Sequence, residues 1–362
     1  MKSLTLPLTE YPSSGIVKYA DSDYIIKNLD NSVVFLDAKN PDKIIAELPI
    51  ENRFEVLCRD NDKLLFFIKE NVLSMADIYC LSLNDFSYEL IENSSFRFCL
   101  PIGSDGNYRF FKQENKIAKL RKDQDLKEPN LEEIIEIDYP PSECLVITDC
   151  IVIPSRSDFI DCFDKSGAHL WRKNLNDLLP KLEEKKGYEI KPFAKGYKNS
   201  LLVSAKNYKL ISIDIPSGKI NWMIDECIDF KWVLTDDGRV ITVFKGHLKI
   251  ISADTGEILS DKLIDEDWVQ PNPIMPNLFQ IAVTDTHLWC AFLGKGLAAI
   301  NLETAAVDFY IHPKSTVNST PKIRNNRMYL QLKGGGIGLD NTGTFECILE
   351  GDGGYKADKD DN

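Results

Sequence analysis

Residues 201–222, with the sequence LLVSAKNYKLISIDIPSGKINW, decide the fold of this chain. Residues 201–205 form one apolar run, and residues 210–215 form a second run in which isoleucines alternate with Ser and Asp. Alternation with a period of two is typical of a half-buried β-strand. Residues 216–218, Pro-Ser-Gly, predict a turn because proline presets φ and glycine supplies a positive φ. The stretch therefore predicts two strands and a third that returns over residues 219–224.

This pattern of two strands, a turn and a returning strand recurs along the chain, and we count eight such units. Their turns are expected near Asn40, Asp85, Asp123, Gly167, Gly218, Gly256, Ala305 and Gly343. A weaker fourth strand precedes several units, for example residues 54–58, 96–100 and 230–236. Four strands in about 40 to 45 residues fit one blade of a β-propeller. We predict an all-β chain whose residues 1–350 form a single propeller of eight four-stranded blades, with seven blades as the alternative.

Each of the five later turns follows an Asp or Asn, whose side chain can bond the backbone two residues on and stabilise the bend. These residues are Asp164, Asp214, Asp254, Asn301 and Asp340. Four residues past the same turns lie Trp171, Trp222, Ser260, Phe309 and Cys347. We expect their side chains to pack between neighbouring sheets.

Two insertions and the end of the chain depart from this pattern. Residues 174–189 are expected to form a short helix starting near Asp177. Residues 265–279 are expected to form a loop, because they contain three prolines, which favour extended backbone and lack a donor. Residues 351–362 are rich in glycine and charge, and we expect them to be a disordered acidic tail.

Composition narrows the possible partners and location. The net charge of −13 argues against nucleic-acid binding and favours a basic protein partner. The nine cysteines are dispersed without a C-x-x-C pair, which indicates buried thiols in a reducing compartment. The first 15 residues lack the apolar core of a signal peptide, and no apolar run reaches the roughly 18 residues of a membrane span. We expect a cytoplasmic protein.

At residues 212–222 and 251–257 the chain resembles the repeats of quinoprotein-type (pyrroloquinoline-quinone-like) β-propellers. The blades of that family carry an Asp, a Thr-Gly or Ser-Gly turn and a strand that ends in Trp. Trp171 and Trp222 match the Trp position, whereas Ser260, Phe309 and Cys347 depart from it. The resemblance covers about half of the chain and implies a fold rather than an activity. A dehydrogenase of this family is expected to carry an adjacent Cys-Cys pair and a calcium site, and neither pattern occurs in the sequence.

No motif in the sequence predicts catalysis. The four histidines, at positions 169, 247, 287 and 312, form no H-x-x-x-H pair, and we interpret them as ordinary strand or loop residues. Gly334, Gly335 and Gly336 are not followed by the Lys-Ser/Thr of a phosphate-binding loop, which favours a tight connection between strands. We therefore expect no catalytic residues, no bound metal and no cofactor.

An acidic cluster beside a tryptophan is the best candidate for a partner-binding site. It consists of Asp261, Asp265, Glu266, Asp267 and Trp268. A Trp anchor with a polar surround is typical of interface hot spots, although a solvated loop is the simpler interpretation.

These observations favour a non-enzymatic protein-binding propeller. One hypothesis is a dedicated inhibitor or immunity protein that neutralises a basic partner such as a toxin domain. The alternatives are a metal-dependent hydrolase or lactonase-type propeller enzyme and a scaffold subunit of a larger assembly.

Overall fold

A computed structural model describes most of the chain. The described residues are 2–3, 16–20, 23–29, 31–40, 43–50, 53–60, 62–69, 77–91, 99–124, 130–139, 144–155, 159–175, 193–205, 209–225, 227, 232–264, 276–292, 296–311, 316–317, 322–324, 327–333, 342–350 and 354–355. Within them the regular structure is β-strand and no α-helix occurs, so none of their elements is a helix long and apolar enough to cross a membrane. The all-β prediction is confirmed.

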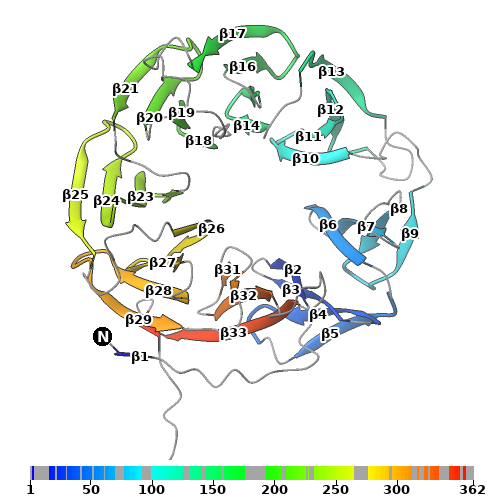
Figure 1. The fold of residues 1–362 in the computed structure, drawn as a ribbon. Helices are drawn as coiled ribbons and strands as arrows, with labels where there is room; N and C mark the ends of the chain where they lie inside the picture. Colours follow the sequence, from blue (N-terminus) through cyan, green and yellow to red (C-terminus); the bar gives the residue numbers. More distant parts are fainter. Residues whose placement is uncertain are drawn as a thin grey trace, which may run out of the picture. The chain divides into compact units, whose positions relative to one another are not determined.

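The described strands form eight sheets, each built mainly from consecutive strands (Figure 1). The sheets divide between two compact units: unit 1 comprises Met1–Asn52, Lys231–Ser252 and Glu257–Asn362, and unit 2 comprises Arg53–Phe230 and Ala253–Gly256. Successive antiparallel sheets of four strands are the blades of a β-propeller, and the predicted fold is confirmed.

Unit 2 contains four four-stranded sheets. They consist of β6 (Arg53–Asp60), β7 (Lys63–Lys69), β8 (Asp77–Ser82) and β9 (Tyr88–Leu90); β10 (Cys99–Ser104), β11 (Tyr108–Gln113), β12 (Lys116–Arg121) and β13 (Glu132–Glu136); β14 (Leu145–Ile147), β15 (Cys150–Pro154), β16 (Phe159–Asp164) and β17 (His169–Asn174); and β18 (Phe193–Tyr197), β19 (Ser200–Ala205), β20 (Lys209–Asp214) and β21 (Ile220–Ile224). The first strands of neighbouring sheets, β6, β10, β14 and β18, lie side by side in that order.

Unit 1 contains the other four sheets, two of which have five strands. They consist of β2 (Ile16–Ala20), β3 (Tyr24–Asn28), β4 (Val33–Asp37) and β5 (Ile44–Leu48); β22 (Val233–Leu234), β23 (Arg239–Phe244), β24 (His247–Ser252) and β25 (Ile258–Leu263); β26 (Pro276–Val283), β27 (His287–Phe292), β28 (Gly296–Asn301), β29 (Val307–Ile311) and β1 (Lys2–Ser3); and β30 (Thr316–Val317), β31 (Lys322–Arg324), β32 (Arg327–Lys333), β33 (Thr342–Glu350) and β34 (Gly354–Tyr355).

Several expected boundaries require correction. The turn predicted at Gly343 is wrong, because Gly343 lies in β33 opposite Leu332 of β32. Residues 276–279, expected in a loop, belong to β26, and the weak strand expected at residues 96–100 is β10, shifted toward the C-terminus. Two residues of the expected disordered tail form β34. The expected helix lies mostly in residues 176–192, which are outside the described residues.

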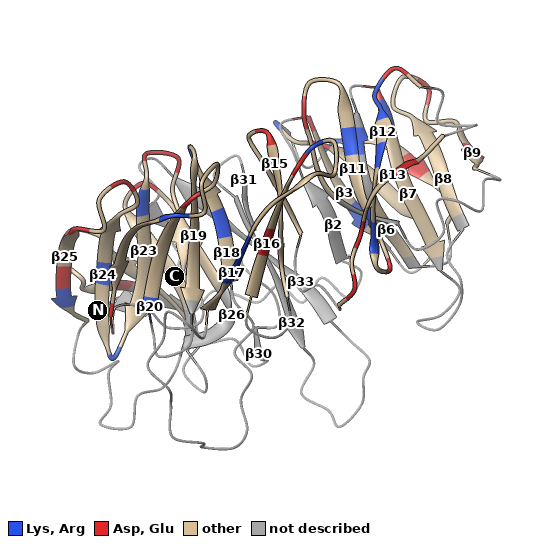
Figure 2. Cartoon of the chain, turned by 90° about the horizontal axis from the view of Figure 1, so that it is seen from above, with Lys and Arg blue, Asp and Glu red and all other residues tan. Residues whose placement is uncertain are grey.

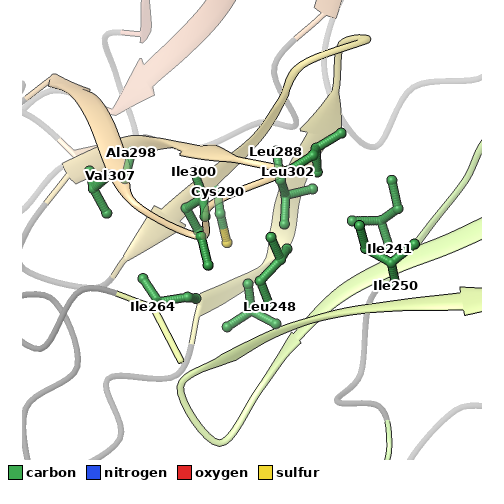
Figure 3. Packing of buried hydrophobic residues seen from close by; sticks show 12 residues of the cluster. Ile241, Leu248, Ile250, Ile264, Leu288, Cys290, Ala298, Ile300, Leu302 and Val307 are labelled. Atoms are coloured by element: carbon green, nitrogen blue, oxygen red, sulfur yellow. The ribbon is translucent and has the colours of Figure 1, made fainter. Parts of the chain in front are cut away.

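The core consists of the apolar faces of neighbouring sheets. In unit 1, Leu248 and Ile250 of β24 form one buried cluster with Leu288, Cys290 and Ile300 of the following sheet (Figure 3). Alternate residues of a strand point to one face, so the period-two pattern places these side chains together. Burial of each large aliphatic side chain contributes about 1.5–3 kcal/mol.

The sheets of unit 2 also interlock through tryptophans. Trp171 of β17 donates from Nε1 to the carbonyl oxygen of Ile215 at 2.6 Å, beside the turn that contains Gly218. Trp222 of β21 donates in the same way to Asp254 at 3.1 Å and lies against Gly256. The expected packing between sheets is confirmed for Trp171, and Trp222 packs on the turn of residues 253–256, which belongs to unit 2.

The side chains that precede the turns cap them where predicted, with one exception. Backbone amides donate to the side-chain oxygens of Asp164, Asp214 and Asn301. The carboxylate of Asp254 instead binds Nζ of Lys198 with both oxygens at 2.9 Å. Asp340 lies outside the described residues.

Candidate protein-interaction surface

The fourth strands of the sheets expose apolar side chains. All the large exposed hydrophobic residues of the described chain lie on β5, β9, β17, β21 or β25: Ile44, Ile45, Tyr88, Leu90, Leu170, Met223, Ile258, Leu259 and Leu263. Clustered apolar side chains on a surface mark interaction sites more reliably than single ones do. The fourth strands are therefore where the interaction surface is to be sought.

β25 carries more of these residues than any other described strand. Ile258, Leu259 and Leu263 are 42%, 52% and 49% exposed. β25 is also the last strand of its sheet, and within the described part of the chain its outer edge pairs with no further strand. Such an edge offers backbone donors and acceptors together with apolar side chains. We call Ile258, Leu259 and Leu263 with this edge the β25 surface.

A sequence difference explains why β25 differs from β17 and β21. Ser260 stands in β25 where the other two strands carry Trp171 and Trp222, and no described group forms a hydrogen bond with its buried Oγ. Lys262, two residues further on, donates instead to the carbonyl oxygen of Glu303 in the next turn. At this position of β25 a lysine tip thus reaches the next turn, and among the described residues no indole occupies the place that Trp171 and Trp222 take in the other two strands.

Of the predicted partner-binding residues, the structure places Asp261. It lies on β25 directly opposite Lys249 of β24, with its Oδ2 3.2 Å from Lys249 Nζ and its Oδ1 2.7 Å from His247 Nδ1. Burial alone would raise the pKa of Asp261, but the hydrogen bonds from Lys249 and His247 lower it. Its negative charge is therefore already balanced within the sheet. Asp265, Glu266, Asp267 and Trp268 lie outside the described residues.

Sequence reasoning missed the three aliphatic residues of β25, because it searched for charge and for tryptophan. The available signal was the dipeptide Ile258-Leu259, two consecutive large apolar residues in a strand predicted to alternate. The register explains why both are exposed: the ladder with β24 shifts between Ile250 and Ile251, so Leu259 is the extra residue of a bulge.

The neighbouring sheet of unit 1 shows that an outer edge in this chain accepts another strand. β1 pairs in parallel with β29, with Lys2 opposite Phe309 and Ser3 opposite Tyr310 (Figure 1). The addition of an extended segment to an exposed sheet edge is a common mode of peptide recognition. Backbone hydrogen bonds supply affinity in this mode, and side chains of the edge strand supply specificity.

The described residues hold no group of three or more His, Cys, Asp or Glu side chains arranged to bind a metal ion. His169, His247 and His287 each lie on a strand next to one aspartate: Asp161, Asp261 and Asp308. His312 lies outside the described residues.

Comparisons with known proteins establish the fold. No protein-family model matches the chain, and no curated protein matches it. Among solved structures, the chain is similar to BamB from Moraxella catarrhalis, with 13% identity and a TM-score of 0.58 over 88% of this chain and 95% of that one. It is similar to the computationally designed protein Ika8, with 11% identity and a TM-score of 0.56 over 89% and 94% of the two chains. It is also similar to Sqt1 from Saccharomyces cerevisiae, with 10% identity and a TM-score of 0.54 over 82% of each chain. At these identities the similarity is one of fold, and the quinoprotein-type resemblance likewise holds at the level of the fold.

Proposed function

We propose that this chain is a non-enzymatic protein-binding β-propeller whose β25 surface receives an extended segment of a partner protein. The observation that carries the proposal is the combination of three exposed aliphatic side chains with the outer edge of one strand. The pairing of β1 with β29 supports strand addition as the mode of binding.

We further propose that the partner is basic and that the chain acts in the cytoplasm as its dedicated inhibitor, in the manner of an immunity protein that neutralises a toxin domain. The net charge of −13 supports this, because a charge of that size attracts basic proteins and speeds their association. Figure 2 shows acidic residues in many of the turns that join the strands. Exposed charges mainly affect the association rate. Apolar contacts of the β25 surface would then keep the dissociation rate of the complex low.

Affinity purification of the full tagged chain from its native host, with quantitative mass spectrometry, tests the proposal. Three forms are compared: the natural chain, a β25 variant with Leu259→Ser and Leu263→Ser, and a control with Leu170→Ser and Met223→Ser. The control removes two exposed apolar side chains from fourth strands of unit 2.

We expect the natural chain and the control to recover one basic protein at near-equal amount, and the β25 variant to recover at least about tenfold less. Equal recovery by the β25 variant would place the interaction elsewhere. Recovery of several proteins in varying amounts would instead support a scaffold within a larger assembly.

A further inference from the structure

A second site lies in unit 2 around Asp161, a buried carboxylate in the middle of β16. Arg172, directly opposite on β17, donates to both carboxylate oxygens at 2.8 and 2.7 Å. Tyr139 donates from its hydroxyl to Oδ2 at 2.8 Å, and His169 Nε2 lies 3.1 Å from Oδ1. Burial alone would raise the pKa of Asp161, but these hydrogen bonds lower it. Asp161 is therefore a fully partnered carboxylate.

The guanidinium of Arg172 is fixed in place by aromatic rings as well as by Asp161. Its central carbon lies 4.2 Å from the ring centroid of Phe159 and 5.7 Å from that of Tyr139. The two rings contact each other edge to face at 4.7 Å. A guanidinium with a bidentate partner and a stacking surface has little remaining freedom. Arg172 and its partners form a rigid wall.

A cavity of about 480 Å³ adjoins this wall, between the sheet β10–β13 and the sheet β14–β17. Besides Tyr139, Asp161 and Arg172, its lining includes Glu136, Asp138 and the ring of Phe163. Three carboxylates therefore face one guanidinium, and the lining carries a net charge of about −2 at neutral pH.

Two of these carboxylates interact with basic groups only through longer-range electrostatics, Glu136 with Lys116 and Asp138 with Arg172. Neither Glu136 nor Asp138 forms an ion pair or a side-chain hydrogen bond with a described residue, in contrast to Asp161. Lys116 lies directly opposite Glu136 in the β12–β13 ladder, but its Nζ forms its ion pair with Glu133 at 2.7 Å. The cavity thus combines a wall built on the buried Asp161, an aromatic residue and two exposed carboxylates that form no direct hydrogen bond or ion pair with a described side chain.

We propose that this cavity binds the guanidinium group of an arginine side chain of the partner protein. A planar cation fits the lining because it can stack on Phe163 and donate from two parallel N–H groups to one carboxylate. The inference rests on the proposed function in one respect only, that the partner is a basic protein.

Titration of the purified full chain with N-acetyl-arginine amide, followed by NMR or calorimetry, tests this inference without any partner. N-acetyl-citrulline amide, the uncharged isostere, and inorganic phosphate are the two comparison probes. We expect saturable binding of the arginine probe with a Kd of about 1–10 mM, at least about tenfold weaker binding of the citrulline probe, and no binding of phosphate.

A paired variant locates the site. Glu136→Gln with Asp138→Asn is expected to weaken arginine-probe binding at least about tenfold. The control Glu132→Gln with Glu133→Gln makes the same charge change on β13, the strand of Glu136, and is expected to stay within about twofold. Equal binding of the citrulline probe, binding of phosphate, equal effects of the two variants, or no saturable binding would each overturn the inference. Because these experiments use small probes, they can fail while capture through the β25 surface succeeds, and the reverse also holds.

Discussion

The indole of Trp171 lies so close to Gly218 that a Cβ atom at position 218 would be 2.9 Å from the ring. Gly218 also has a positive φ of 66°, a conformation that costs an ordinary L-residue about 1–2 kcal/mol. The glycine therefore serves both the turn and the contact between two sheets.

We predict that Gly218→Ala lowers the free energy of unfolding by about 1–3 kcal/mol, because the methyl group adds a steric clash to backbone strain. Chemical denaturation followed by tryptophan fluorescence measures the effect. Gly106→Ala is the control, because nothing lies within 4 Å of a Cβ at that exposed position. A similar loss of stability in both variants would show that the Trp171 contact is unimportant.

We predict that Asp161→Asn lowers the free energy of unfolding by about 2–4 kcal/mol at neutral pH. This expected loss of stability is at or below the loss caused by breaking a fully buried ion pair, because the side chain of Arg172 is half exposed. Denaturant unfolding of both proteins at pH 7 measures the difference. A loss under about 0.5 kcal/mol would indicate that water replaces the carboxylate at little cost.

The same pair of proteins is expected to differ in pH dependence. The folded-state pKa of Asp161 is lowered, so its stabilisation is fully present above the unfolded-state pKa of about 3.9 and is lost as the pH falls through the folded-state pKa. The stability difference between the natural chain and Asp161→Asn should therefore be constant above about pH 5 and shrink toward pH 2. A difference that grows on acidification contradicts this assignment.

We predict that Ser260→Ala leaves the free energy of unfolding unchanged or raises it by up to about 1 kcal/mol. The buried Oγ of Ser260 has no hydrogen-bond partner among the described residues, so removing it ends a desolvation penalty. Thermal unfolding of the two proteins measures the effect. A loss above about 1 kcal/mol would reveal a hydrogen bond that the structure does not contain.

We predict that the thiols of Cys162 and Cys290 resist alkylation in the folded chain. Burial raises the pKa of Cys290 to about 12 and also raises the pKa of Cys162, and the reactive species is the thiolate. Mass spectrometry after brief iodoacetamide treatment, with and without denaturant, measures the labelling. Rapid labelling under native conditions would show that the sheets around these residues open easily.

Local patterns in the sequence predicted most of the fold, because each hairpin is encoded within about 25 residues. The isoleucines of residues 210–215 alternate as a strand requires, and Asp214 and Gly218 bracket a turn whose geometry they stabilise. The eighth turn was misplaced at Gly343 because glycine is permitted in a strand as well as in a turn. The bulge at Leu259 also escaped prediction, since a register shift depends on the partner strand.

The two sites were harder to predict because their residues are distant in sequence. Asp161 meets Tyr139, which precedes it by 22 residues, and Arg172, which follows it by 11, only through the pairing of strands and the contact of sheets. One local signal was present: an aspartate in the centre of the apolar run at residues 159–163, where a buried polar group requires partners. The identity of those partners follows from the register and from nothing in the local sequence.

Hydrogen–deuterium exchange on the purified complex with the captured partner tests the central claim most directly. We predict that backbone amides of β25, residues 258–263, exchange at least about tenfold more slowly in the complex, because an added strand occupies the outer edge. Amides of β9, a fourth strand in unit 2 that also exposes apolar side chains, should be unchanged. Unchanged exchange in β25 together with slowing in β9 or elsewhere would contradict the claim that β25 receives the partner.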